Sequence, residues 1–176
     1  MVDAVHTILN NSFGLGFSSR RVTISTAGLV QRLSDLGKET EVNLAVSLNA
    51  TENETRSRLM PINRKYPIEK LLDACRRYRL KPRRRITFEY ILLKGINDSA
   101  EDANRLAKLL RPIRAKINLI PFNEYEGSAF RRPEESVLNR FVEILHKNGY
   151  TAIIRHSKGR DICAACGQLR AKIQSS

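Results

Sequence analysis

Five short apolar runs rich in β-branched residues alternate along this chain with stretches of helical periodicity, and this alternation limits the folds open to it. The runs occupy residues 21–25, 42–48, 86–93, 116–121 and 150–155. Because they are too continuously apolar for hairpin strands with one exposed face, they predict parallel strands buried on both faces. Amphipathic helices are predicted between them, over residues 27–36, 68–78, 99–110 and 134–147. The order predicts an α/β fold with right-handed crossovers, either an open parallel sheet or an open (βα) barrel.

Residues at the ends of the helical stretches support these boundaries. Ser99 is a capping residue at the start of one helix. Pro133 precedes the last helix and Gly149 follows it, which matches the usual positions of proline and glycine at helix ends. Gly37 is expected to end the first helix.

Positive charge dominates the composition. The 31 Lys and Arg residues exceed the 18 Asp and Glu residues, which gives a formal net charge of +13. An excess of this size favours a nucleic-acid partner, because each contact with a phosphate releases counterions. The alternative is a solvated basic surface without such a partner.

The sequence also indicates the compartment. It contains no apolar run close to the roughly 20 residues that span a bilayer. Its N-terminus lacks the charged-then-apolar order of a signal peptide. Three cysteines are too few, and odd in number, for a secreted disulfide framework. A cytoplasmic location is therefore expected.

Small polar residues follow several of the predicted strands. Ser25 ends the first strand, Ser47 and Asn49 flank Leu48 at the end of the second, and Asn123 follows the fourth. Turn chemistry enriches the same residue types. However, ligands of parallel α/β folds bind at the carboxyl ends of the strands, where these residues recur together. They therefore predict a site for a polar ligand with several hydrogen-bonding groups.

Cys163 and Cys166 form a C-x-x-C motif near the C-terminus. A redox pair would be expected beside aromatic or proline flanks, which are missing here. A zinc site would need two more ligands, for which only His156 and the core-facing Cys75 are available. A single reactive thiolate at Cys166, beside the small Gly167, fits the segment better than either alternative.

Basic residues gather at both ends of the predicted strands. The run over residues 76–85 precedes a strand and is interpreted as a solvated face. The better candidates for RNA contacts lie at the opposite end, interleaved with aromatic residues that could stack on unpaired bases. The basic ones are Arg64, Lys65, Arg131, Arg132, Arg155, Lys158 and Arg160, and the aromatic ones are Tyr66, Phe122, Tyr125 and Phe130.

Six segments together resemble the radical S-adenosylmethionine (SAM) RNA methyltransferases that methylate adenine C2 in 23S ribosomal RNA and tRNA. They are residues 20–28, 45–50, 60–66, 89–90, 116–123 and 161–169, in the order of the family. The resemblance extends over nearly the whole chain. It implies a partial (βα) barrel of the radical-SAM type that lacks its first strands, with SAM as cofactor and RNA as substrate.

The resemblance also implies roles for particular residues. Ser25, the turn over Ser47, Leu48 and Asn49, and Asn123 match positions that bind SAM, although the family usually has histidine in place of Asn49. Cys166 matches the cysteine that first accepts a methyl group from SAM. A 5′-deoxyadenosyl radical from a second SAM then abstracts hydrogen from this methyl group, and the carbon radical adds to adenine C2.

The chain lacks several sequence motifs of the family. The family's [4Fe–4S] cysteines, in C-x-x-x-C-x-x-C, its glycine–glutamate SAM motif and a second catalytic cysteine all belong upstream. Residues 1–176 are therefore expected to be the C-terminal part of the catalytic barrel, without the N-terminal RNA-binding domain or any metal ligand. As such, the chain is either a fragment of a longer enzyme or an inactive truncated product.

Three expectations remain open at this stage. The protein could be a non-catalytic RNA-binding remnant of the family, or it could act on adenine C8 rather than C2, because a related branch shares these motifs. The open strand edge at residues 21–25 is also expected to promote self-association.

Overall fold

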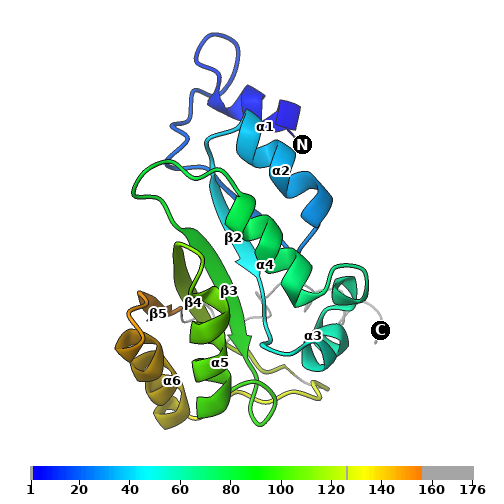
Figure 1. Cartoon of the computed structure of the whole chain (residues 1–176), viewed down its shortest axis with the longest axis vertical. Coiled ribbons are helices and arrows are strands. Elements are labelled where there is room, and N and C mark those ends of the chain that lie inside the picture. The colour runs from blue at the N-terminus through cyan, green and yellow to red at the C-terminus, as the bar shows by residue number, and fades with distance from the viewer. Residues whose placement is uncertain (1, 126, 156–176) are drawn as a thin grey trace.

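A computed structural model describes residues 2–125 and 127–155 of the protein (Figure 1). The strands of these residues form one parallel sheet in the order β1-β2-β3-β4-β5. The strands are β1 (Thr23–Thr26), β2 (Asn43–Ser47), β3 (Ile86–Leu92), β4 (Ala115–Pro121) and β5 (Ala152–Ile154). The helices are α1 (Val2–Leu9), α2 (Val30–Glu39), α3 (Asn53–Leu59), α4 (Ile68–Arg77), α5 (Ala100–Leu110) and α6 (Glu135–Lys147), with a 3₁₀ turn η1 (Pro61–Arg64).

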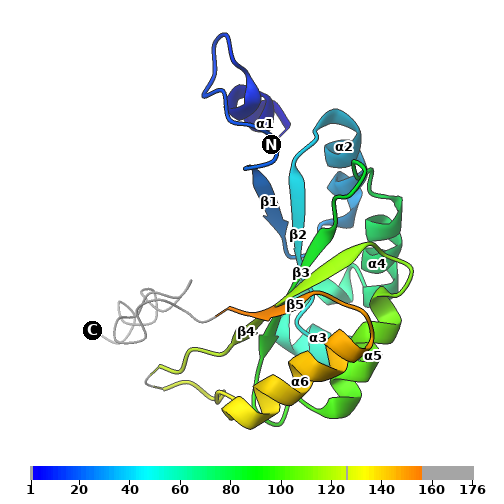
Figure 2. The ribbon, with the colours of Figure 1, turned by 90° about the vertical axis from the view of Figure 1, so that its left-hand side faces the viewer.

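The helices that connect the strands lie on one side of the sheet (Figure 2). Right-handed crossovers between strands that follow one another in space put every connecting helix on the same face, as in a (βα) barrel. The opposite face carries no helix from the described part of the chain. The α/β prediction is confirmed, whereas the expectation that the strands are buried on both faces is wrong for these residues.

The hydrophobic core fills the space between the sheet and these helices. Alternate side chains of the strands point into it, because successive side chains of a strand face opposite ways. Phe88 and Tyr90 of β3 are fully buried there, and the ring of Tyr90 lies 5.7 Å from that of Phe141 on α6. Leu71 of α4 and Leu106 of α5 are equally inaccessible.

Most predicted boundaries lie within two residues of the observed ones, but the first predicted helix is displaced by three residues at each end. Helix α2 begins at Val30 and continues past Gly37 to Glu39, so Gly37 does not end it. A Cβ atom on Gly37 would lie 3.0 Å from the ring of Tyr78, which shows that this glycine allows close packing instead. Ser99 caps α5 as predicted.

None of the helices in the described ranges is both long and apolar enough to cross a membrane. Helix α3 and the turn η1 were not predicted. Their sequence, with six polar residues in the seven of α3, lacks the apolar periodicity that marks the other helices.

Candidate functional site

The face of the sheet that no described helix covers carries a row of polar side chains. Ser25 pairs in register with Ala45, while Ser47 pairs with Glu89 and Glu89 with Asn118. Register partners in a parallel sheet point to the same face, and so do residues two positions apart. The hydroxyl of Ser25 donates a hydrogen bond to Oε2 of Glu89 at 3.3 Å, across the intervening strand. Four adjacent strands thus contribute hydroxyl, carboxylate and amide groups to one surface.

Only some of the predicted ligand-binding residues present their side chains on this polar face. Ser25 is exposed and Ser47 half-buried, both on the polar face. Leu48 is fully buried, so only its backbone is available to a ligand. Asn49 adopts a left-handed conformation with φ of 59°, and its Oδ1 accepts a hydrogen bond from the Ile91 backbone at 2.9 Å. Asn123 is half-buried and follows β4 by two residues.

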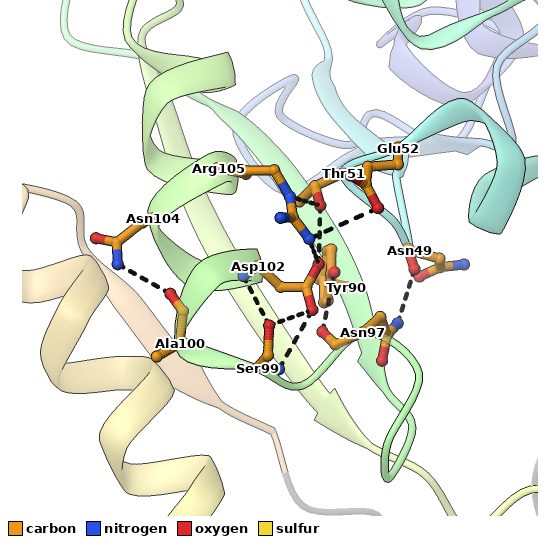
Figure 3. Close-up of polar contacts among 10 residues, drawn as sticks. All are labelled: Asn49, Thr51, Glu52, Tyr90, Asn97, Ser99, Ala100, Asp102, Asn104 and Arg105. Carbon is orange, nitrogen blue, oxygen red and sulfur yellow. Dashed lines mark hydrogen bonds and ion pairs between the residues drawn. The ribbon is translucent and has the colours of Figure 1, made fainter.

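A buried asparagine in the loop after β3 holds the turn that contains Asn49. The side-chain amide of Asn97 donates to the carbonyl oxygens of Asn49, at 2.8 Å, and Ile91, at 2.7 Å. Its Oδ1 accepts from the Leu93 backbone at 2.8 Å. Burial raises the pKa of Tyr90 far above its usual range, so its hydroxyl remains a donor to the Asn97 carbonyl. The ends of β2 and β3 are therefore tied together below the polar face (Figure 3).

A second polar group joins helix α5 to the same turn (Figure 3). The carboxylate of Asp102 accepts hydrogen bonds from Thr51, at 2.9 Å, and from Arg105, at 2.7 Å. Asp102 and Ser99 also form a reciprocal capping box at the start of the helix. Arg105 reaches further to Glu52, at 3.6 Å. These contacts fix the segment that follows Asn49 against α5.

The cysteines contribute no described metal or redox site. Cys75 is buried on α4, and burial raises the pKa of its thiol to about 12, as expected of an inert core cysteine. Cys163, Cys166 and the candidate zinc ligand His156 lie outside the described residues, as do Lys158 and Arg160. Among the described residues, no three His, Cys, Asp or Glu side chains gather as metal ligands would.

The predicted RNA-contacting residues are only partly at the surface. Tyr66 is buried at 7% exposure, so the prediction that it stacks on bases is wrong. Phe122 lies 6.2 Å from Tyr125 and 6.0 Å from Phe130, measured between ring centroids, and Tyr125 is exposed. The basic residues Arg64, Lys65, Arg131 and Arg155 are exposed, while Arg132 is half-buried and pairs with Glu135.

Sequence reasoning assigned no individual role to four residues of this region: Arg56, Glu89, Asn97 and Asn118. One signal was available for Glu89, since a carboxylate inside an apolar strand sequence marks a side chain that does not enter the core. Asn118 lies in a similar apolar run. Nothing in the local sequence distinguishes Arg56 or Asn97 from ordinary surface residues.

The fold of the chain is similar to that of solved proteins. Over 92% of its length the chain superimposes on a radical SAM methyltransferase from Sphaerobacter thermophilus, with a TM-score of 0.85 and 48% identity, and it covers 48% of that protein. A domain of pyruvate-formate lyase-activating enzyme from Bacteroides vulgatus shares the fold alone, with a TM-score of 0.58 and 16% identity. The chain thus has the α/β fold of a radical SAM methyltransferase.

Sequence matches define the relationship more narrowly. The chain is 61% identical to the dual-specificity RNA methyltransferase RlmN of Desulfosudis oleivorans and 54% identical to that of Geobacter sulfurreducens, each over 99% of its length. It covers 47% and 48% of these proteins, so it spans about half the length of the curated relatives it matches. No family model matches the chain. These identities support the assignment of the chain to the C-terminal part of the RlmN family.

Proposed function

We propose that the polar face of the sheet binds SAM, and that the longer protein containing this chain transfers its methyl group to adenine C2 of ribosomal RNA and tRNA. The observation that carries the proposal is the surface made by Ser25, Ser47, Glu89 and Asn118 on the side of the sheet that no described helix covers. The high identity to RlmN proteins supports the same reading.

The residues of the polar face suit SAM chemically. Hydroxyl and amide groups hydrogen-bond to ribose hydroxyls and to the methionine carboxylate. The carboxylate of Glu89 accepts from ribose hydroxyls or pairs with the positive charges of SAM. Ser47 and the turn after it lie at the carboxyl end of β2, where parallel α/β folds bind their ligands. Bound there, SAM would supply an activated methyl group.

A [4Fe–4S] cluster does not fit this chain. Such clusters are held by cysteine thiolates, usually four. The whole sequence has three cysteines, and the buried Cys75 leaves only two for a cluster. The ligands would have to come from outside this chain.

Cys166 is proposed as the methyl-accepting group. Its thiolate attacks the methyl carbon, the new bond forms between that carbon and Sγ, the bond from carbon to the SAM sulfur breaks, and S-adenosylhomocysteine leaves. The exposed aromatic and basic residues after β4 are proposed to contact the RNA, in keeping with the net charge of +13. A cytoplasmic location and self-association through the edge of β1 remain predictions.

The test is an anaerobic assay of the longer protein, loaded with its cluster, with SAM, a reductant and transcripts of 23S ribosomal RNA and tRNA. Nucleosides are then separated by mass and retention time. We expect 2-methyladenosine, and we expect none from the 176-residue chain alone. Appearance of 8-methyladenosine would overturn the C2 assignment. Salt-dependent RNA binding without SAM binding would overturn the enzymatic proposal in favour of a binding remnant.

A further inference from the structure

Arg56 lies at the centre of the backbone that forms the proposed SAM site, although it points away from the polar face. Its side chain is completely buried. Nε donates to the carbonyl of Leu48 at 2.9 Å, and Nη2 donates to the carbonyls of Ala27, at 3.0 Å, and Ser47, at 3.1 Å. One planar group therefore binds the turn after β1 and the turn after β2 at the same time.

The remaining contact of the guanidinium fixes its own position. Nη1 donates to Oδ1 of Asn63 at 2.9 Å. The amide of Asn63 in turn donates to the Asn53 carbonyl, at 3.1 Å, and to the Ser57 hydroxyl, at 2.8 Å. Asn63 is itself 2% exposed. The guanidinium is thus held in one orientation by α3 and η1, and this orientation determines where the three carbonyls lie.

Burial of the positive charge of Arg56 has a cost in free energy. All four of its hydrogen bonds go to neutral oxygens. Burial lowers the pKa of Arg56 to about 10, which still leaves it protonated at neutral pH. No carboxylate of the described residues pairs with this buried cation, so its desolvation cost of several kcal/mol is offset mainly by hydrogen bonds to neutral oxygens. An apolar residue of similar volume would leave these four oxygens without this donor, so the arginine is what holds them in their present arrangement.

The turn after β1 has a backbone conformation that allows it to approach the guanidinium of Arg56 closely. Gly28 has a φ of +118°, a conformation that residues with side chains rarely adopt. A Cβ atom at this position would lie 3.4 Å from Nη2 of Arg56 and 3.6 Å from Leu71. The glycine allows the chain to turn directly after the Ala27 carbonyl, so that this carbonyl meets the arginine.

We propose that Arg56 is a positioning residue that sets the relative placement of Ser25 and Ser47 for SAM. Ser25 precedes the Ala27 carbonyl by two residues, and the Ser47 carbonyl is itself a ligand of the guanidinium. This inference rests on the proposed function, because it assigns Arg56 to the same SAM site. It predicts that Arg56 acts on SAM affinity and not only on folding.

The test compares Arg56→Lys with wild type in the longer protein, by calorimetric titration with SAM. Lysine keeps the charge but has a single ammonium in place of the planar fork, so it cannot hold both turns in the same geometry. We expect SAM to bind at least about tenfold more weakly, with a matching rise in the KM for SAM. Gly28→Ala provides a second variant, which disturbs the same contact from the other side and should give the same loss.

Leu106→Ala is the matched control, because it destabilises the core from α5 without touching either turn. It should lower the free energy of unfolding and leave the affinity for SAM unchanged. The proposal is overturned if folded Arg56→Lys and Gly28→Ala bind SAM as wild type does, or no more weakly than Leu106→Ala does. Failure of the wild-type protein to bind SAM at all would instead contradict the proposed function.

Discussion

Replacing Cys166 with alanine in the longer protein is expected to lower RNA methylation by at least about a thousandfold, because the proposed mechanism needs a thiolate to accept the methyl group. SAM affinity should be nearly unchanged, since the polar face on the sheet remains intact. The measurement is single-turnover transfer of a labelled methyl group from SAM, first to protein and then to RNA. In the variant, label should reach neither.

Cys163→Ala is the natural control for this experiment. Cys163 lies three residues before Cys166 in a segment outside the described residues, and the resemblance to the family assigns it no role. Its replacement should leave methylation within about twofold of wild type, as expected for a substitution that removes no functional group. If Cys163→Ala abolished activity as completely as Cys166→Ala, the two cysteines would act as a redox pair and the single-thiolate account would be wrong.

Phe88→Ala should cause the largest loss of stability among simple truncations in the sheet, roughly 3–5 kcal/mol. Phe88 is fully buried on the central strand β3, at the face covered by helices, so its removal leaves a cavity. Such a loss is a large fraction of the roughly 5–15 kcal/mol that stabilises an ordinary domain. Urea unfolding of the 176-residue chain, followed by circular dichroism, measures it.

Ile153→Ala provides the comparison on the opposite face. Ile153 pairs in register with Asn118 and is 53% exposed on β5. Its truncation should change the free energy of unfolding by less than about 1 kcal/mol. Equal losses in the two variants would mean that the core does not lie between the sheet and its helices.

The order of the elements could be predicted because each strand contains a run of apolar residues, and each helix except α1 and α3 has a clear apolar face. Residues such as Phe88 and Leu106 are buried because they lie on these apolar faces. Their spacing can be recognised in the sequence without knowledge of the fold. The wrong expectation that the strands are buried on both faces arises from the same apolar runs. Ala45, Ile91 and Ile120 make the uncovered side of the strands look apolar in the sequence, although Ser47, Glu89 and Asn118 lie on it.

The candidate site was only half visible in the sequence. Ser25 and Ser47 could be found because they end strands, and strand ends are where α/β folds bind ligands. Arg56 could not, because its role depends on carbonyl oxygens of residues 8, 9 and 29 positions away. A sequence does not show which backbone carbonyls will accept hydrogen bonds from a side chain. An arginine that binds them therefore cannot be distinguished from other arginines. Tyr66 was misplaced for a related reason, since its burial depends on the unpredicted turn η1.

If the polar face of the sheet binds SAM, the carboxylate of Glu89 should contribute to the affinity, so the decisive measurement is SAM binding by Glu89→Gln. Glutamine preserves the size of the side chain and removes the charge that faces the proposed ligand. Glu101→Gln on α5 is the control, because Glu101 is exposed on the side of the sheet that carries the helices. Calorimetry on the longer protein should show binding weakened about tenfold by Glu89→Gln and unchanged by Glu101→Gln. Wild-type affinity in Glu89→Gln would contradict the assignment of this face to SAM.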